Sequence, residues 1–261
     1  MAAAAGQRLD DASPIVDATI NGDIRLHAVL PPLAKEGVSV SLRMIRTRAF
    51  SLQDLVQAQA FSAATAEQIR GWVVEGCSIL ISGATGVGKT TLLATLLGLV
   101  PRNQRIVCIE EVSELAAEHP HVVRLQARSA NIEGEGEMGL EGLVRAAVRM
   151  RPDRLVLGEC RGAEVREVLT ALNTGHQGSF ATIHANSIED VPARLVALGM
   201  LGGLSQGSVA VMAQSAFDRV IHMGRSPSGH RYVSEIGRLV RDADGLRGVT
   251  DMRFSWDGGP G

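Results

Sequence analysis

The sequence predicts an α/β domain with a largely parallel central sheet, and three observations lead to this prediction. From residue 79 onward, short apolar runs alternate with segments in which apolar residues recur at helical spacing. The apolar runs are continuous, as in strands that are buried on both faces of a parallel sheet. A glycine-rich segment at 83–88 separates the first run from the first helical segment. Strands and helices that alternate in this way form parallel sheets with helices packed on their faces.

The elements of this domain can be placed in order along the chain. Six apolar runs are predicted strands: 79–81, 106–109, 122–125, 155–157, 180–183 and 220–221. Three segments have the apolar spacing of helices packed against a sheet: 93–100, 140–148 and 165–172. The first of these helices ends before Pro101, and Gly175 suits the position just after the third.

The residues before this domain have a different pattern. The runs 26–30 and 38–42 are predicted strands, and Pro31-Pro32 separates them. This stretch is too short for an independent domain, since domains rarely fall below about 50 residues. We therefore interpret residues 1–50 as a short remnant of an N-terminal α+β domain followed by a linker.

Two further helices are expected where the α/β domain begins. Ser51 and Asp54 have the spacing of a capping box, which predicts a helix through Leu55 and Val56. A second helix carries Ala66, Ile69, Trp72 and Val73 on one face and ends at Gly76. The α/β domain is then expected to span residues 51–245, and residues 246–261 are expected to form a flexible tail.

The composition argues against several classes of protein. The chain has 261 residues, of which 45% are hydrophobic and 21% charged, as in ordinary globular proteins. The net charge of -2 and the aromatic content of 3% argue against direct binding of nucleic acid. The three cysteines lack metal-ligand spacing, which predicts reduced thiols. With no signal-peptide pattern and no apolar run of about 18 residues, a cytoplasmic protein is expected.

The most specific motif is G-x-x-x-x-G-K-T, which follows an apolar strand and opens a helix. Its glycines let backbone N–H groups point at phosphate oxygens, and the helix N-terminus favours negative charge. Lys89 supplies a charge for the β- and γ-phosphates of ATP, and the Thr90 hydroxyl can ligate Mg²⁺. The predicted nucleotide-binding residues are Gly83, Ala84, Thr85, Gly86, Val87, Gly88, Lys89, Thr90 and Thr91.

Three other polar groups follow predicted strands, at the edge where α/β sheets bind ligands. Glu159 ends the strand 155–157 after one glycine, where an acid can face a metal ion bound beside the P-loop. Glu110, Glu111 and Glu114 follow the strand 106–109, either as part of the site or as a solvated acidic loop. His184 follows the strand 180–183, although a single histidine is more often structural.

Four motifs in this order resemble the type II/IV secretion-system ATPases. They are the P-loop, the segment 109–115, the segment 151–161 that ends in Gly-Glu-x-Arg, and the pair Leu-Asn-Thr-Gly-His and Thr-Ile-His-Ala-Asn in 172–186. The segments 128–134 and 146–154 are similar to the tight-adherence (Flp) pilus assembly branch. The resemblance covers roughly residues 13 to 240, and it implies a RecA-like P-loop NTPase core.

The resemblance also implies roles for individual residues. Glu114 matches the catalytic carboxylate that orients and deprotonates the attacking water. Glu159 matches the Walker B acid, which would place Mg²⁺ together with Thr90, and His184 matches the histidine near the γ-phosphate. Glu111 stands where Asp is usual. Family members deliver arginines to the γ-phosphate from the region of Arg43, Arg46 and Arg48, of which we favour Arg43 and Arg46.

At the level of the whole protein, the resemblance implies an ATP-hydrolysing motor in a homohexameric ring. Such a motor works at the inner face of the cell membrane with a platform protein, and it powers pilus assembly or protein secretion. A non-hydrolysing nucleotide-binding regulator and a conjugation-system ATPase remain alternatives. A GTPase is disfavoured because the chain has no Asn/Thr-Lys-x-Asp motif. Residues 204–207 echo an ABC-type signature but lie downstream of Glu159 rather than upstream.

Overall fold

The computed structural model describes residues 7–22, 24–45, 48–128, 136–243 and 245–256. The chain divides into two compact units, residues 1–48 and 49–261. This boundary lies two residues before the end of the predicted N-terminal segment. Each unit has its own sheet and its own apolar core.

The first unit is a small antiparallel sheet. Its strands are β1 (Ile15–Ile20), β2 (Ile24–Val29) and β3 (Ser39–Met44), which lie in that order. The predicted strands 26–30 and 38–42 correspond to β2 and β3, whereas β1 was not predicted. Four buried side chains form its core: Val16, Ala18, Leu26 and Ala28. Every residue of the edge strand β3 is exposed.

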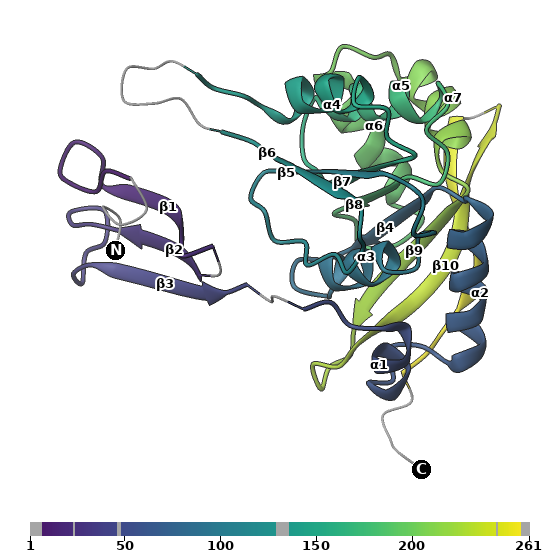
Figure 1. Cartoon of the computed structure of the whole chain (residues 1–261), viewed down its shortest axis with the longest axis horizontal. Coiled ribbons are helices and arrows are strands. Elements are labelled where there is room, and N and C mark those ends of the chain that lie inside the picture. The colour runs from purple at the N-terminus through teal and green to yellow at the C-terminus, as the bar shows by residue number, and fades with distance from the viewer. Residues whose placement is uncertain (1–6, 23, 46–47, 129–135, 244, 257–261) are drawn as a thin grey trace. The chain divides into compact units, whose positions relative to one another are not determined.

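The second unit is built on an eight-stranded sheet in the order β11-β10-β9-β4-β8-β7-β5-β6 (Figure 1). Its strands are β4 (Ile79–Gly83), β5 (Ile106–Glu110), β6 (Val122–Gln126), β7 (Arg154–Cys160), β8 (Phe180–Ile183), β9 (Arg219–Arg225), β10 (Arg231–Asp242) and β11 (Gly245–Arg253). The strands from β9 to β6 run parallel to one another, and β10 and β11 are antiparallel. The predicted α/β class with a largely parallel sheet is confirmed.

Seven helices accompany the strands in the described part of this unit. They are α1 (Leu52–Gln57), α2 (Ala63–Glu75), α3 (Lys89–Leu97), α4 (Leu140–Val148), α5 (Val165–Leu172), α6 (Val191–Leu201) and α7 (Gln206–Ala216). The capping box at the start of α1 is present, because Ser51 and Asp54 each bind the other's backbone N–H. α2 ends at Gly76, which takes the left-handed conformation that the prediction required.

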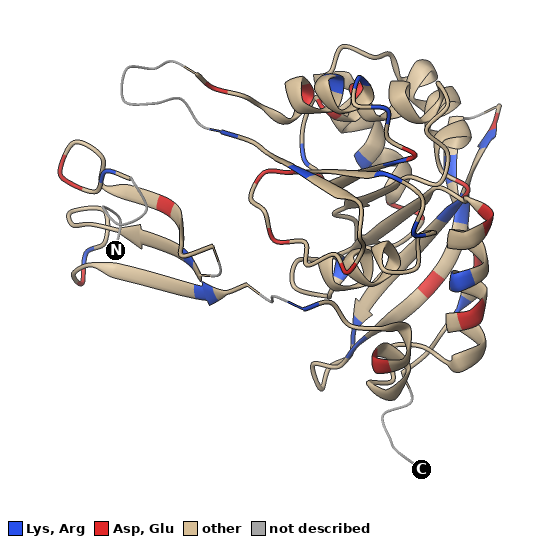
Figure 2. Ribbon diagram, viewed as in Figure 1, with Lys and Arg blue, Asp and Glu red and all other residues tan. Residues whose placement is uncertain are grey.

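Alternate residues of the buried strands enter two separate cores, one on each face of the sheet. Ile79 and Ile81 of β4 pack with α1, α2 and α3, whereas Leu80 packs with the layer formed by α4, α5, α6 and α7. β5 follows the same period of two, which is why both strands are apolar throughout. The outward face of α2 carries charges of both signs in sequence, at Glu67, Arg70 and Glu75 (Figure 2).

The expected flexible tail was wrong for residues 246–253, which form β11 at the edge of the sheet. β10 and β11 pair along most of their length, with one register shift between Ile236 and Gly237. A Cβ at Gly237 would lie 2.1 Å from the Val249 carbonyl oxygen, so glycine permits this close pairing. Residues 257–261 of the expected tail lie outside the described residues.

Helix length gives one further result. Within the described ranges, no single helix is long and apolar enough to cross a membrane. α6 and α7 reach that length and composition only as a pair, and the chain bends by 119° between them.

Candidate functional site

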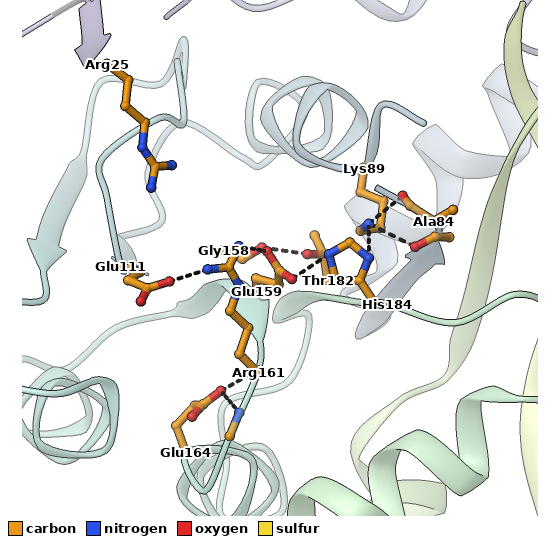
Figure 3. Close-up of polar contacts among 12 residues, drawn as sticks. Arg25, Ala84, Lys89, Glu111, Gly158, Glu159, Arg161, Glu164, Thr182 and His184 are labelled. Carbon is orange, nitrogen blue, oxygen red and sulfur yellow. Dashed lines mark hydrogen bonds and ion pairs between the residues drawn. The ribbon is translucent and has the colours of Figure 1, made fainter. Parts of the chain in front are cut away.

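The candidate site lies where the parallel strands end. β4 leads into the glycine-rich loop, and α3 begins at Lys89. β7 and β8 pair in parallel, so Glu159 near the end of one strand and His184 just after the other share this edge. Figure 3 shows Lys89, His184, Glu159, Arg161 and Glu111 following one another across it.

The backbone of the loop depends on its glycines. Gly83 has a φ of 147°, and an added Cβ would lie 2.6 Å from the Met223 carbonyl oxygen on the neighbouring strand β9. Gly88 has a φ of 102° and stands at the N-cap of α3. Because glycine has no side chain to cap the helix, the first N–H groups of α3 face the loop and are suited to an anion. Ala84, Thr85 and Gly86 are exposed.

Lys89 is buried beneath this loop, with 7% of its surface exposed. Its Nζ donates to the carbonyl oxygens of Gly83 and Ala84, both at 2.9 Å. A third contact, at 3.2 Å, joins Nζ to Nδ1 of His184. Burial lowers the pKa of Lys89 to about 8, although the Glu159 carboxylate partly opposes this shift. The lysine is therefore charged at neutral pH but close to losing its proton.

His184 connects Lys89 to Glu159. Its Nε2 lies 2.6 Å from Oε1 of Glu159. Burial and then the Lys89 charge lower the pKa of His184, while Glu159 raises it. A neutral imidazole with its proton on Nε2 satisfies both neighbours, since Nδ1 can then accept from Lys89 and Nε2 faces the carboxylate. This tautomer is inferred from the two contacts.

Arg161 holds the other oxygen of Glu159. Its Nη2 lies 2.8 Å from Glu159 Oε2, and its Nη1 pairs with Glu111. The hydrogen bond that Arg161 donates to Glu159 is the main reason that the pKa of Arg161 is raised above its ordinary value. The backbone N–H of Arg161 donates to Glu164 at 2.6 Å, which fixes the start of this segment. Arg161 thus links the segment after β5 to the acid of β7.

Gly158 explains why a glycine separates the apolar run from Glu159. A Cβ at residue 158 would lie 3.1 Å from Cγ of Glu110 on β5, so a larger residue would require the Glu110 side chain to shift by a few tenths of an ångström. The pairing of β7 with β8 also shifts register between Leu157 and Cys160. A bulge of this kind re-aims the side chain that it carries, here Glu159. Thr182 of β8 closes the turn by donating to the Gly158 carbonyl oxygen at 2.6 Å.

The structure brings together three of the predicted site residues, Lys89, Glu159 and His184. Thr90 is exposed and Thr91 half-buried in the first turn of α3. Glu114 follows β5, and its backbone N–H binds the Glu110 carboxylate. Arg43 lies on β3 in the first unit, and Arg46 lies outside the described residues. The roles of these residues stay predictions.

Sequence reasoning missed the part that Arg161 plays. Arg161 is the arginine of the Gly-Glu-x-Arg motif, but its contact with Glu111 joins residues 50 apart in the chain. A motif read along one segment gives no sign of that partner. The acidic cluster after β5 was the only available signal, and it did not say which carboxylate would face the arginine.

The residues present fit a magnesium ion. Within the described ranges, no group of three or more His, Cys, Asp or Glu side chains could hold a metal by itself. Mg²⁺ needs no such cage, because it commonly takes one or two protein oxygens together with phosphates and water. Glu159 Oε1 is buried and makes no hydrogen bond of acceptable geometry to a described residue, despite its close approach to His184. That oxygen has the chemistry of a magnesium ligand, and the Thr90 hydroxyl stays the predicted second ligand.

A family model described as type II/IV secretion system protein matches residues 2–243. The chain belongs to this family of secretion-system ATPases. The resemblance seen in the four motifs is thereby confirmed. Family membership implies that the chain binds ATP. The tight-adherence branch stays a prediction, and residues 129–134 of its motif lie outside the described ranges.

Named relatives and solved structures agree with the family. A putative conjugal transfer protein of Mycobacterium tuberculosis is 48% identical over 251 residues, which are 94% of this chain and 71% of that protein. The VirB11 type IV secretion system protein of Bartonella quintana is 33% identical over 215 residues, 69% of this chain and 60% of that one.

Solved structures of two ATPases share the architecture. The VirB11 ATPase of the Brucella suis type IV secretion system has a TM-score of 0.56 at 26% identity, and the match covers 91% of this chain and 78% of that one. The Legionella pneumophila ATPase DotB has a TM-score of 0.58 at 20% identity, covers 91% and 61%, and shows the fold alone.

Proposed function

We propose that this protein is an ATP-hydrolysing motor that powers a secretion or pilus system. The observation that carries the proposal is the contact of Lys89, at the start of α3, with His184, which in turn meets Glu159 at the same sheet edge. A glycine-rich loop, a buried lysine and an acid at the same end of the parallel strands are the parts that phosphoryl transfer from ATP requires. A protein that only binds nucleotide would need no acid in contact with the histidine beside that lysine.

Each part has a role in this proposal. The N–H groups of the loop and of the first turn of α3 bind the phosphates of ATP, and Lys89 neutralises the β- and γ-phosphates. Binding moves the lysine charge from backbone carbonyls to phosphate oxygens. Thr90 and Glu159 would hold Mg²⁺, which supplies charge neutralisation at the phosphates. His184, whose Nδ1 accepts from Lys89 and whose Nε2 faces Glu159, would hold the lysine and the acid in position around the γ-phosphate.

Glu114 is proposed as the residue that activates water. A carboxylate within hydrogen-bond reach of the attacking water orients it and accepts its proton. Removing a general base of this kind costs about 10²–10⁴-fold in rate. Arg43 and Arg46 are proposed to complete the charge around the γ-phosphate, a contribution that reaches about 10³–10⁵-fold in related enzymes. If so, Ala at one of these positions lowers kcat strongly and leaves ADP affinity nearly unchanged.

A homohexameric ring that docks on an inner-membrane platform protein is the proposed assembly. Support comes from the family and from its solved members in type IV secretion systems. The process served is the finer question. A relative that is 48% identical is named as a putative conjugal transfer protein, so a conjugation-system ATPase is the specific second candidate. Pilus assembly of the tight-adherence type rests on the segments 128–134 and 146–154 alone.

The deciding experiment measures phosphate release and nucleotide binding in the same preparations. Glu114→Gln and Glu159→Gln keep the size of the side chain but lose its charge, so both variants should bind ATP and lose turnover. Thr170→Ala, on the exposed face of α5, is the matched control and should turn over like the parent. Parental turnover in either glutamine variant would remove that residue from the mechanism. ATP binding without any turnover in the parent, even with a platform protein, would favour the regulator.

Assembly has its own measurement. The mass of the purified chain with Mg²⁺ and a slowly hydrolysed ATP analogue gives the ring size directly. A hexamer with turnover per chain that rises with protein concentration supports the motor. A monomer with full activity at every concentration contradicts it.

A further inference from the structure

Glu110 is a buried carboxyl group at the site to which none of the proposed steps assigns a role. It is the last residue of β5, and only 5% of its surface is exposed. An ionisable group is rarely buried this far unless something specific holds it. Its neighbours in the chain are the acidic residues that follow β5, and its neighbours in space lie on β7.

One oxygen of Glu110 holds the segment that carries Glu114. Oε1 accepts the backbone N–H of Glu114 and the backbone N–H of Leu115, both at 2.9 Å. Leu115 is itself buried, with 3% of its surface exposed, so its N–H has little access to water. The segment between Glu110 and Leu115 is therefore closed into a loop by two hydrogen bonds to one oxygen atom.

The stem of Glu110 touches the strand that carries Glu159. Its Cγ lies where a Cβ at Gly158 would approach to 3.1 Å, and Gly158 directly precedes Glu159. Figure 3 shows Gly158 beside Glu159 in the row of polar contacts. Glu110 thus lies against the backbone of β7 while it binds the backbone of the Glu114 segment. The two acids proposed for catalysis are placed by elements that meet at this side chain.

The second carboxylate oxygen of Glu110 holds no backbone group. Oε2 is buried and makes no hydrogen bond to any described residue. Desolvation of this carboxyl raises the pKa of Glu110, and its two backbone hydrogen bonds oppose the shift. Glu110 thus contributes through the oxygen Oε1, which accepts two hydrogen bonds, whereas burial of its negative charge is unfavourable.

We propose that Glu110 is a positioning residue, whose Oε1 fixes the segment 111–115 so that the Glu114 carboxylate meets the attacking water. The inference rests on the role proposed for Glu114. Displacement of a catalytic group by about 1 Å can cost 10²-fold in rate. Loss of Glu110 should therefore slow the chemical step, whereas the P-loop contacts that bind ATP remain.

Three substitutions separate this role from a merely structural one. Glu110→Ala removes the acceptor, and kcat should fall by about 10–100-fold with little change in KM or in the affinity for a fluorescent ATP analogue. Glu110→Gln keeps an oxygen at the same reach that can accept both N–H groups, so it should stay within about threefold of the parental kcat. Glu110→Asp keeps the charge but withdraws the oxygens by one methylene, so its kcat should fall below that of the glutamine variant.

A stability control removes the remaining ambiguity. Val209 is fully buried on α7, in the core on one face of the sheet, and Val209→Ala should lower thermal stability without lowering kcat of the folded protein. Should Glu110→Ala fail to fold, the order of the other two variants decides the matter. A glutamine variant as slow as the alanine variant, or slower than the aspartate variant, would overturn the proposal, because charge rather than the acceptor would then matter.

The same assay distinguishes this inference from the proposed function. Glu114→Gln is measured beside the Glu110 series. If Glu114→Gln turns over ATP at the parental rate, the role of Glu114 is lost and the inference with it. If Glu114→Gln is inactive while Glu110→Ala keeps the parental kcat, only the inference is overturned.

Discussion

Two buried cationic side chains, at opposite ends of the parallel strands, offer a direct comparison. Lys89 lies at the carboxyl ends of the parallel strands, and Arg154 begins β7 at their amino ends. Both are nearly inaccessible, at 7% and 2% exposure, and both donate to backbone carbonyls. Arg154 binds the carbonyls of Gly178 at 2.8 Å and Val73 at 3.0 Å and the side chain of Gln104 at 2.7 Å.

The two cations differ in what lies beyond those carbonyls. Lys89 also meets His184, which leads to Glu159 and Arg161, so its environment contains groups that can change charge. Arg154 is bonded to neutral acceptors on three different parts of the unit. A guanidinium keeps its charge at any ordinary pH, whereas a buried lysine does not. Fixed acceptors are typical of a structural cation, and exchangeable partners are typical of a functional one.

The largest expected effect is on turnover when Lys89 is removed. Lys89→Ala takes away the charge on the β- and γ-phosphates, so phosphate release should fall by at least about 10²–10³-fold. The unfolding midpoint should change far less than turnover, because the Ala84 carbonyl that Lys89 binds lies in the exposed part of the loop and removing a buried charge offsets the loss of the bond to Gly83. Turnover is measured by phosphate release and folding by urea unfolding. Parental turnover in this variant would refute the P-loop assignment.

At the amino ends of the strands, we expect a loss of stability without a loss of turnover. Arg154→Ala leaves the Gly178 carbonyl without its donor, at a cost of about 1–3 kcal/mol for a group left buried and unpaired, and it removes one of the two donors of the Val73 carbonyl, which Gly76 N–H also binds. Urea unfolding should show this loss, while kcat per folded molecule stays parental. Arg102→Ala, at an exposed arginine, is the control. A variant of Arg154 that is stable but inactive would contradict the comparison.

A substitution at Gly178 perturbs the contacts of Arg154 without removing the arginine. Its φ is 73°, and a Cβ would lie 1.8 Å from Nη1 of Arg154. Gly178→Ala should displace the guanidinium and strain the backbone, with a stability loss of about 1–3 kcal/mol. Gly175→Ala is the matched control, since that glycine also has a positive φ but has open space around its Cβ position. Equal losses in the two variants would show that backbone strain alone is responsible.

The smallest and most specific effect is on pH dependence. The pKa of Lys89 is lowered from 10.5 to about 8, so the folded chain releases this proton while the unfolded chain still holds it. Between these values, the contribution of Lys89 to the free energy of unfolding therefore rises with pH. ATP affinity should move the opposite way, by up to about tenfold per pH unit above 8, because the phosphates need the charged lysine. Binding and unfolding measured at pH 7 to 10, with Lys89→Ala as reference, should show the two opposite trends.

The sequence was informative where local pattern decides structure. The loop after β4 and the capping box of α1 each depend on residues within a few positions of one another, and both were predicted. Charged residues interrupt the apolar pattern of β10 and β11 at irregular spacing, at Arg238, Arg241 and Arg247 among others, and they hid both strands. The part that Arg161 plays was missed and the role of Glu110 was left open, because their partners are set by the approach of separate strands.

Because β4 lies inside the sheet, the chain passes abruptly from a buried strand to the exposed P-loop. β4 is paired on one side with β8 and on the other with β9, and all five of its residues are buried. Its amides should exchange with deuterium only when the whole unit unfolds, since no smaller opening exposes them. The exposed residues Ala84, Thr85 and Gly86 follow at once and should exchange early. Amides that exchange slowly, in β4, and amides that exchange fast, in the loop, are then only a few residues apart. If a phosphate binds, exchange should slow in the loop alone, and the β4 amides provide the unchanged reference.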